Sequence, residues 1–155
     1  MLKALSVHVE KCCGCRICEL ICAYQHFQQN NPKKAAIRVF PLFPNPASNV
    51  PIVCHHCGVP KCVEQCPEEA LYKAQDGRVL LDAKKCTGCR ACLDACPFTA
   101  LYFHGDMITP IICDLCDGDP VCVKWCPTNA LRFTPLSVIG QERRVRTATA
   151  MAGES

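Results

Sequence analysis

Hydrophobic residues along this chain occur in short stretches that polar residues and prolines interrupt. Although 50% of the residues are hydrophobic, twelve prolines divide the chain. No stretch approaches the roughly 18–20 uninterrupted apolar residues of a membrane span. Residues 37–40 predict a β-strand, and residues 71–81, with Asp76-Gly77 as the turn, predict a β-hairpin. The pattern therefore predicts short elements in a protein that is soluble or reaches a membrane only through a partner.

A unit of sequence recurs three times at intervals of thirty residues. Each copy contains Cys-Pro followed two residues later by Ala-Leu. Proline fixes φ and removes a backbone donor, so it ends one element and redirects the polypeptide. We therefore expect a turn and then a short strand after Cys66-Pro67, Cys96-Pro97 and Cys126-Pro127. The residues just before these cysteines predict short helices, at 63–65, 93–95 and 123–125.

Two other segments depart from this repeat. Residues 41–51 contain four prolines and predict an ordered or polyproline II-like loop. The cysteine-free tail at 136–155 allows two interpretations. It is either a frayed terminus or a docking arm, led by Leu136, Val138 and Ile139, that lies on a neighbouring subunit or mediates self-association.

Cysteine changes the picture most, because 17 of the 155 residues are cysteine. Sixteen of them form four runs of four. The spacing C-x2-C-x2-C-x3-C-P is that of bacterial-type [4Fe–4S] ferredoxins, in which the fourth cysteine ligates the other cluster of a pair. Sixteen thiolates, at four for each cubane, predict four [4Fe–4S] clusters. The runs are Cys12, Cys15, Cys18 and Cys22; Cys54, Cys57, Cys62 and Cys66; Cys86, Cys89, Cys92 and Cys96; and Cys113, Cys116, Cys122 and Cys126.

Some residues inside the runs are not ligands. At Gly14, Gly58 and Gly88 the backbone must pass close to inorganic sulfide, and a positive φ is expected. The remaining cysteine, Cys13, is expected to be a small buried or half-buried apolar residue, with a redox or ligand-exchange role as the alternative. Arg16 and Arg90, each directly after a ligand, either raise a cluster potential or are ordinary surface charges.

Other uses of cysteine fit the sequence less well. Structural zinc sites use two C-x2-C pairs or histidines at set offsets rather than a triplet followed by Cys-Pro. A disulfide framework is typical of exported proteins, whereas the first residues lack the apolar region of a secretory signal. We therefore expect a reducing, cytoplasmic location.

Size and charge limit the remaining possibilities. A protein of 155 residues with 6% aromatic residues forms one compact unit or two small ones with little core, so metal ligation is expected to stabilise the fold. The formal charge of +3 falls to about −5 when sixteen thiolates and four dicationic cores are included. Because the basic residues are also scattered, nucleic-acid binding is not expected.

The four runs together resemble the four-cluster ferredoxin-like electron-transfer subunits of molybdopterin enzymes. The motifs that carry this resemblance are Cys54-His55-His56-Cys57, Pro60-Lys61-Cys62, the Asp76-Gly77 hairpin and the stretch 85–90. The family includes subunits of dimethyl sulfoxide reductase-type and formate dehydrogenase-type enzymes, hydrogenase-linked polyferredoxins and the small subunit of bacterial tungsten aldehyde oxidoreductases. The bridge at 31–39 and the short length favour the aldehyde oxidoreductase group.

The resemblance also implies which runs exchange ligands, a choice that spacing alone leaves open. The first and fourth runs pair, as do the second and third. Cluster 1 would be held by Cys12, Cys15, Cys18 and Cys126; cluster 2 by Cys113, Cys116, Cys122 and Cys22; cluster 3 by Cys54, Cys57, Cys62 and Cys96; and cluster 4 by Cys86, Cys89, Cys92 and Cys66.

The implied fold is α+β, with two ferredoxin-like units of short strands and helices, one inserted in the other. Residues 1–50 and 106–135 would form the outer unit, residues 51–105 the inner unit and residues 136–155 a C-terminal tail.

The expected function is outer-sphere transfer of single electrons through the four clusters. The protein would connect a large catalytic subunit, with a tungsten or molybdenum pterin cofactor, to a flavin subunit or another redox acceptor. The alternative is the equivalent subunit of a hydrogenase or formate dehydrogenase complex. An enzyme that converts a substrate at one of its own clusters is disfavoured, because full cysteine ligation leaves no open iron position and no catalytic constellation is present. His55 and His56 are expected to pack or hydrogen-bond rather than ligate, and Trp125 to pack in the core.

Overall fold

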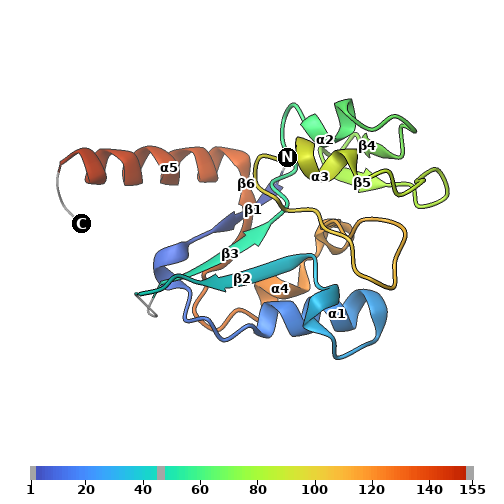
Figure 1. The fold of residues 1–155 in the computed structure, drawn as a ribbon. Helices are drawn as coiled ribbons and strands as arrows, with labels where there is room; N and C mark the ends of the chain where they lie inside the picture. The colour runs from blue at the N-terminus through green and yellow to red at the C-terminus, as the bar shows by residue number, and fades with distance from the viewer. Residues whose placement is uncertain (1–2, 45–47, 153–155) are drawn as a thin grey trace.

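Three two-stranded antiparallel sheets organise the computed structural model, which describes residues 3–44 and 48–152 (Figure 1). One sheet joins the two ends of the cysteine-rich region, and each of the other two is a hairpin. The strands are β1 (Lys3–Val7) with β6 (Leu131–Pro135), β2 (Ile37–Pro41) with β3 (Asn49–Val53), and β4 (Leu71–Lys73) with β5 (Val79–Leu81).

Four helices each carry the third cysteine of a run. Cys62, Cys92 and Cys122 lie in short helices that end before the fourth cysteine, where the following proline prevents continuation. In the first run Ala23 replaces that proline, so the helix continues through Cys22 to Phe27. The predicted short helices are therefore confirmed, with earlier starts. The helices are α1 (Ile17–Phe27), α2 (Lys61–Glu64), α3 (Ala91–Ala95), α4 (Val121–Lys124) and α5 (Leu136–Met151).

The predicted strands are largely confirmed. The 71–81 hairpin forms, and Gly77 has a φ of +85° in its turn. Strand β2 includes the predicted residues 37–40. The middle copy of the repeat differs, because Tyr102 makes only an isolated bridge to Ile111 rather than entering a strand.

The prediction of a proline-rich loop at 41–51 was wrong at both ends. Pro41 ends β2, and Pro51 lies within β3 opposite Val39. Proline is tolerated here because each strand of a two-stranded sheet has a free edge that needs no N–H donor. The middle of the segment, residues 45–47, lies outside the described residues.

The tail is helical rather than frayed. The first turns of α5 pack on β1 and β6, with Ile139 buried, and Glu142 forms ion pairs with His8 and Arg132. Beyond them the helix extends away from the body of the molecule (Figure 1). Residues 153–155 of the predicted tail are outside the described residues.

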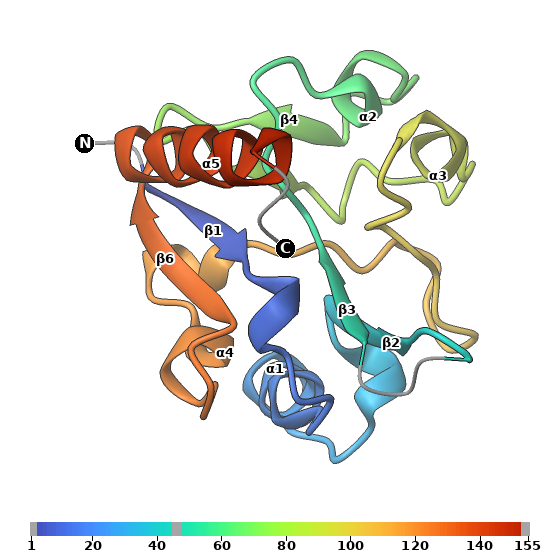
Figure 2. The same ribbon diagram turned by 90° about the vertical axis from the view of Figure 1, so that its left-hand side faces the viewer.

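Buried apolar residues form two groups. The larger group lies among β1, β6, α1 and the β2–β3 hairpin (Figure 2) and includes Leu5, Ile37, Val53 and Leu131. The smaller group lies beneath the β4–β5 hairpin and includes Leu71, Val79 and Leu101. Both contain several cysteines of the four runs. No helix in the described part of the molecule is long and apolar enough to span a membrane.

A buried carboxylate ties α1 to the β2–β3 hairpin. Glu19 is 1% exposed, and its Oε1 accepts a hydrogen bond from the backbone N–H of Val39 at 2.6 Å. Its Oε2 lies 3.8 Å from Nη1 of Arg38. Because Glu19 follows Cys18 directly, this contact fixes the helix that carries two cysteines of the first run.

Replacement of Glu19 by alanine leaves the Val39 N–H without a partner in the interior. We expect Glu19→Ala to lower the free energy of unfolding by about 2 kcal/mol, measured by guanidinium unfolding with detection of visible absorption and circular dichroism. Glu64→Ala removes an exposed carboxylate paired with Lys61 and should cost at most about 0.5 kcal/mol. Equal effects of the two substitutions would contradict a structural role for Glu19.

Candidate iron–sulfur cluster sites

All seventeen cysteines are free of disulfides, and most of the sixteen run cysteines are buried or half-buried. Only two run cysteines, Cys15 and Cys89, are exposed. Cys13 is exposed as well, so the prediction that it would be buried or half-buried was wrong. It lies in the non-helical segment before α1.

Each run has a left-handed residue directly before its second cysteine. The φ values are +71° at Gly14, +46° at His56, +77° at Gly88 and +59° at Leu115. The prediction from glycine was therefore correct for Gly14 and Gly88. It was wrong for Gly58, which does not have a positive φ; His56 takes that conformation in the second run.

A second left-handed residue follows each Cys-Pro, at Glu69, Thr99 and Asn129. This turn directs the next backbone N–H back to the cysteine sulfur. The N–H of Ala70 lies 3.3 Å from Cys66 Sγ, and that of Ala100 lies 3.5 Å from Cys96 Sγ. The repeated Cys-Pro-x-x-Ala sequence thus builds a backbone donor for the fourth cysteine of the run.

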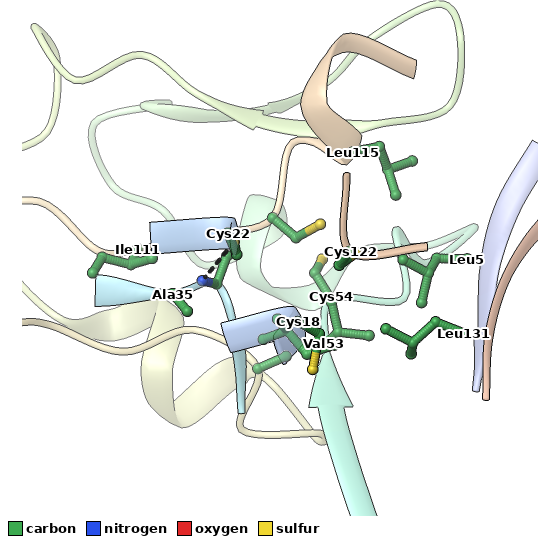
Figure 3. Packing of buried hydrophobic residues seen from close by; sticks show 14 of the residues in the cluster. Leu5, Cys18, Cys22, Ala35, Val53, Cys54, Ile111, Leu115, Cys122 and Leu131 are labelled. Carbon is green, nitrogen blue, oxygen red and sulfur yellow. Dashed lines mark hydrogen bonds between the residues drawn. The ribbon is translucent and has the colours of Figure 1, made fainter. Parts of the chain in front are cut away.

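The other two fourth cysteines receive equivalent donors. Cys22 has no following proline, and its Sγ accepts from the Ala36 N–H at 3.3 Å (dashed line in Figure 3). At Cys126 burial alone would raise the thiol pKa, but backbone donors led by Leu131 lower it overall. Hydrogen bonds from N–H groups to ligand sulfur are one of the means by which proteins set cluster potentials.

Burial raises the pKa of the inner cysteines strongly. It is the main cause that raises the pKa of Cys18, Cys54 and Cys122 to about 12 and that of Cys22 and Cys92 to about 11. These sulfurs lie among apolar side chains, as Figure 3 shows for four of the five. Buried thiolates of this kind require bound cations, which a cluster supplies.

Neighbouring thiolates add to the burial effect and show which sulfurs lie close together. After burial, the pKa of Cys54 is raised by Cys62, Cys57 and Cys96, and that of Cys122 by Cys22 and Cys116. In the same way, the pKa of Cys92 is raised by Cys62, Cys66 and Cys86. The pKa of Cys15 is raised by Cys13 and Cys126. Each of these four cysteines therefore lies near a cysteine of a different run.

Histidine and carboxylate groups also approach the fourth run. The side chains of His26, Asp114 and Cys116 offer ligand atoms within 4.8 Å of one another, with His26 Nε2 3.6 Å from Cys116 Sγ. Sequence reasoning missed His26, because no local motif connects residues that are 90 positions apart. Cys116 belongs to the fourth run, so this histidine lies beside a predicted cluster ligand.

The structure also places the other side chains that the sequence singled out, with one correction. His55 packs on Phe98 at 4.3 Å between ring centroids, and His56 Nδ1 accepts the Val79 N–H, which are contacts of the expected packing and hydrogen-bonding kind. Arg16 and Arg90 are exposed. Trp125, expected in the core, is 60% exposed and caps the C-terminal end of the short helix α4.

The donors fit [4Fe–4S] clusters. The protein offers sixteen clustered cysteine sulfurs, N–H groups directed at them and left-handed turns that bring main-chain atoms close. These features define an iron–sulfur protein of the ferredoxin-like class. Residues 47–136 match the model of the 4Fe-4S dicluster domain family, and the protein belongs to that family.

Its relatives are iron–sulfur subunits of oxidoreductases. The sequence is 41% identical over 83 residues to the polyferredoxin-like subunit of aliphatic sulfonate oxidoreductase of Pyrococcus furiosus, covering 53% of this protein and 47% of the relative. It is 38% identical over 88 residues to a subunit of the tetrathionate reductase of Archaeoglobus fulgidus, and the match covers 55% of this protein and 41% of the relative. For a subunit of the anaerobic dimethyl sulfoxide reductase of Escherichia coli the identity is 30% over 93 residues, with 52% and 44% covered. The matched region thus spans about half or less of these curated relatives.

Solved structures show a similar polypeptide in one complex. A component of the active site complex BamBC of benzoyl coenzyme A reductase, as isolated, superposes with a TM-score of 0.51 at 27% identity, covering 96% of this protein and 90% of the other. The same complex with 1,5-dienoyl-CoA gives a TM-score of 0.51 at 30% identity, with 86% and 75% covered. Mixed helix and strand content and this likeness confirm the α+β class.

The left-handed glycines provide a test of the turn geometry. A Cβ at Gly88 would lie 2.8 Å from the carbonyl oxygen of Ile108 in a backbone with a φ of +77°, whereas a Cβ at Gly105 meets nothing within 4 Å. We expect Gly88→Ala to reduce the iron bound per molecule by up to one cluster, and Gly105→Ala to bind as much iron as the unaltered protein. Iron and acid-labile sulfide analysis measures both. Full iron content in Gly88→Ala would show that the turn is not required.

Proposed function

We propose that this protein relays single electrons through four [4Fe–4S] clusters between a catalytic oxidoreductase subunit and a second redox partner. The observation that carries the proposal is that fourteen of the sixteen run cysteines are buried or half-buried, that cysteines of different runs lie near one another, and that only Cys15 and Cys89 are exposed. A [4Fe–4S] cluster, when bound, accepts and releases one electron at a time. The polypeptide itself contributes the ligands, their burial and the order of the four groups.

The proposed ligand sets exchange the last cysteine between runs. Set 1 is Cys12, Cys15, Cys18 and Cys126; set 2 is Cys22, Cys113, Cys116 and Cys122; set 3 is Cys54, Cys57, Cys62 and Cys96; and set 4 is Cys66, Cys86, Cys89 and Cys92. Electrostatic effects between cysteines of different runs support this exchange. Cys96 raises the pKa of Cys54, and Cys66 raises the pKa of Cys92. For the first and fourth runs, Cys126 raises the pKa of Cys15, and Cys22 raises the pKa of Cys122.

The contacts between sets support a linear order. Cys18 of set 1 raises the pKa of Cys122 of set 2, and Cys54 of set 3 raises the pKa of Cys113 of set 2. Cys62 of set 3 acts on Cys92 of set 4. The order 1–2–3–4 puts exposed Cys15 at one end and exposed Cys89 at the other. Electrons would therefore enter and leave near these two residues.

The same exchange accounts for the proposed domain organisation. Residues 1–50 and 106–135 form the outer ferredoxin-like unit, and residues 51–105 form the inner unit inserted in it. The pairing of β1 with β6 and the packing of α1 on α4 support an outer unit made from both ends of this region. The packing of α2 on α3 and the β4–β5 hairpin support a separate inner unit.

The proposed partner is a large catalytic subunit with a tungsten or molybdenum pterin cofactor, and a flavin subunit or another redox acceptor takes the electrons onward in the cytoplasm. Relatives named as subunits of sulfonate, tetrathionate and dimethyl sulfoxide oxidoreductases support a catalytic partner. None of the relatives named above is an aldehyde oxidoreductase. That assignment rests on the sequence resemblance alone, with a hydrogenase or formate dehydrogenase complex as the alternative.

Paired substitutions test the ligand exchange. If Cys54 and Cys96 hold the same cluster, the Cys54→Ala, Cys96→Ala double variant damages one cluster, and the matched Cys54→Ala, Cys66→Ala variant damages two. Iron and sulfide analysis with EPR of the reduced proteins counts the intact clusters. Local ligation within each run would reverse the two results and contradict the proposed sets.

EPR during stepwise anaerobic reduction tests the relay itself. Clusters in adjacent sets should interact magnetically, so the fully reduced protein should show broadened, coupled signals instead of independent simple ones. Addition of a candidate substrate to the isolated protein should leave the signals unchanged. Independent signals would contradict a relay, and a substrate-dependent signal would favour catalysis at a cluster.

A further inference from the structure

The ring of His56 has a defined proton position. The backbone N–H of Val79 lies 2.9 Å from His56 Nδ1 and points at it. A backbone N–H can only donate, so Nδ1 must carry a lone pair in this contact. A neutral imidazole with a free lone pair on Nδ1 carries its proton on Nε2. Nε2 is therefore a hydrogen-bond donor.

This donor is buried and has no partner. Among the described residues, His56 Nε2 and Thr134 Oγ1 are the two buried side-chain polar atoms without a hydrogen bond. Buried donors in native proteins are nearly always paired, and an unpaired one indicates a missing acceptor. An acceptor that the polypeptide does not supply is therefore expected next to Nε2.

The charged groups that face His56 cannot provide the acceptor. Arg78 is a donor only. The carboxylate of Asp76 is engaged by the backbone N–H and Nε of Arg78. Asp114 accepts the N–H of Cys116 at Oδ1 and lies near His26. None of these carboxylates is hydrogen-bonded to His56 Nε2 in the structure.

The position of His56 points to the two inner ligand sets. It lies between Cys54 and Cys57 of set 3, and its own N–H is 3.5 Å from Cys54 Sγ. Arg78, directly before the Val79 that donates to the ring, donates from Nη1 to the carbonyl oxygen of Asp114 at 3.1 Å, and Asp114 lies between Cys113 and Cys116 of set 2. His56 therefore stands where sets 2 and 3 adjoin.

We propose that His56 Nε2–H donates a hydrogen bond to a sulfur of one of the two inner clusters and thereby sets its potential. The inference rests on the proposed cluster sets. A donor to sulfur favours the more negatively charged, reduced state, so it raises the potential of the cluster that receives it. His56 acts as a positioning and tuning residue, not as a ligand.

Two substitutions at position 56 distinguish the role of Nε2 from that of Nδ1. His56→Asn keeps an acceptor near the Nδ1 position and tolerates the left-handed backbone, but it removes the Nε2 donor. His56→Gln can place an amide donor near the Nε2 position. We expect the midpoint potential of one cluster to fall in His56→Asn and to return towards the original value in His56→Gln. His55→Asn, the same change at the neighbouring position, should leave all potentials unchanged.

A spectroscopic measurement avoids dependence on a folded variant at position 56. With ¹⁵N placed only in the imidazole rings of histidine, because the His56 backbone nitrogen itself lies 3.5 Å from Cys54 Sγ, pulsed EPR of the reduced holoprotein should detect ring nitrogen coupled to a cluster. Because His26 also approaches Cys116, the measurement is made in His26→Asn, where the coupling from His56 should persist. In the His26→Asn, His56→Asn protein it should disappear.

The outcomes distinguish this inference from the relay proposal. Unchanged potentials in His56→Asn together with no ¹⁵N coupling in His26→Asn would overturn it, and would indicate that a water molecule satisfies Nε2. Loss of magnetic interaction between clusters, with the ¹⁵N coupling retained, would contradict the relay while leaving the role of His56 in place.

Discussion

The arrangement of this protein depends on the burial of cysteine sulfur. Burial raises the pKa of Cys18, Cys54 and Cys122 to about 12, so without cations these side chains remain neutral thiols. Ligation of iron requires thiolates, and the positive charge of iron makes their burial favourable. Folding and cluster binding are therefore coupled, and the two small apolar groups contain ligand cysteines as part of their packing.

The backbone is shaped to serve the same sulfurs. A left-handed residue precedes the second cysteine of every run, and another follows each Cys-Pro. These turns bring the N–H groups of Ala70 and Ala100 to ligand sulfur. Around them, the β1–β6 pair joins the two ends of the cysteine-rich region, which lets the first and fourth runs meet. His56 has both a left-handed backbone, with a φ of +46°, and a buried ring nitrogen, Nε2, and it lies between Cys54 and Cys57 of the second run.

The sequence predicted what is encoded locally. Cysteine spacing indicated the cluster class, and Cys-Pro and Asp76-Gly77 located turns, because each depends on a few adjacent residues. Features set by distant contacts were missed, such as the approach of His26 to Cys116 and the β2–β3 pairing across four prolines. The four-residue helix α4 was too short for periodicity to show which way Trp125 points. The helical tail was not predicted, although it contains good helix formers such as Ala148 and Ala150, because its first turns pack on strands β1 and β6, of which β1 is distant in the sequence.

The proposed ligation of four [4Fe–4S] clusters by sixteen cysteines is tested by ⁵⁷Fe Mössbauer spectroscopy of the anaerobically purified, fully loaded protein. We expect roughly sixteen iron atoms per molecule, all in the spectrum of oxidised, diamagnetic [4Fe–4S] clusters with four sulfur ligands at each iron. About eight iron atoms per molecule, a substantial [3Fe–4S] or mononuclear component, or zinc in place of iron would contradict it.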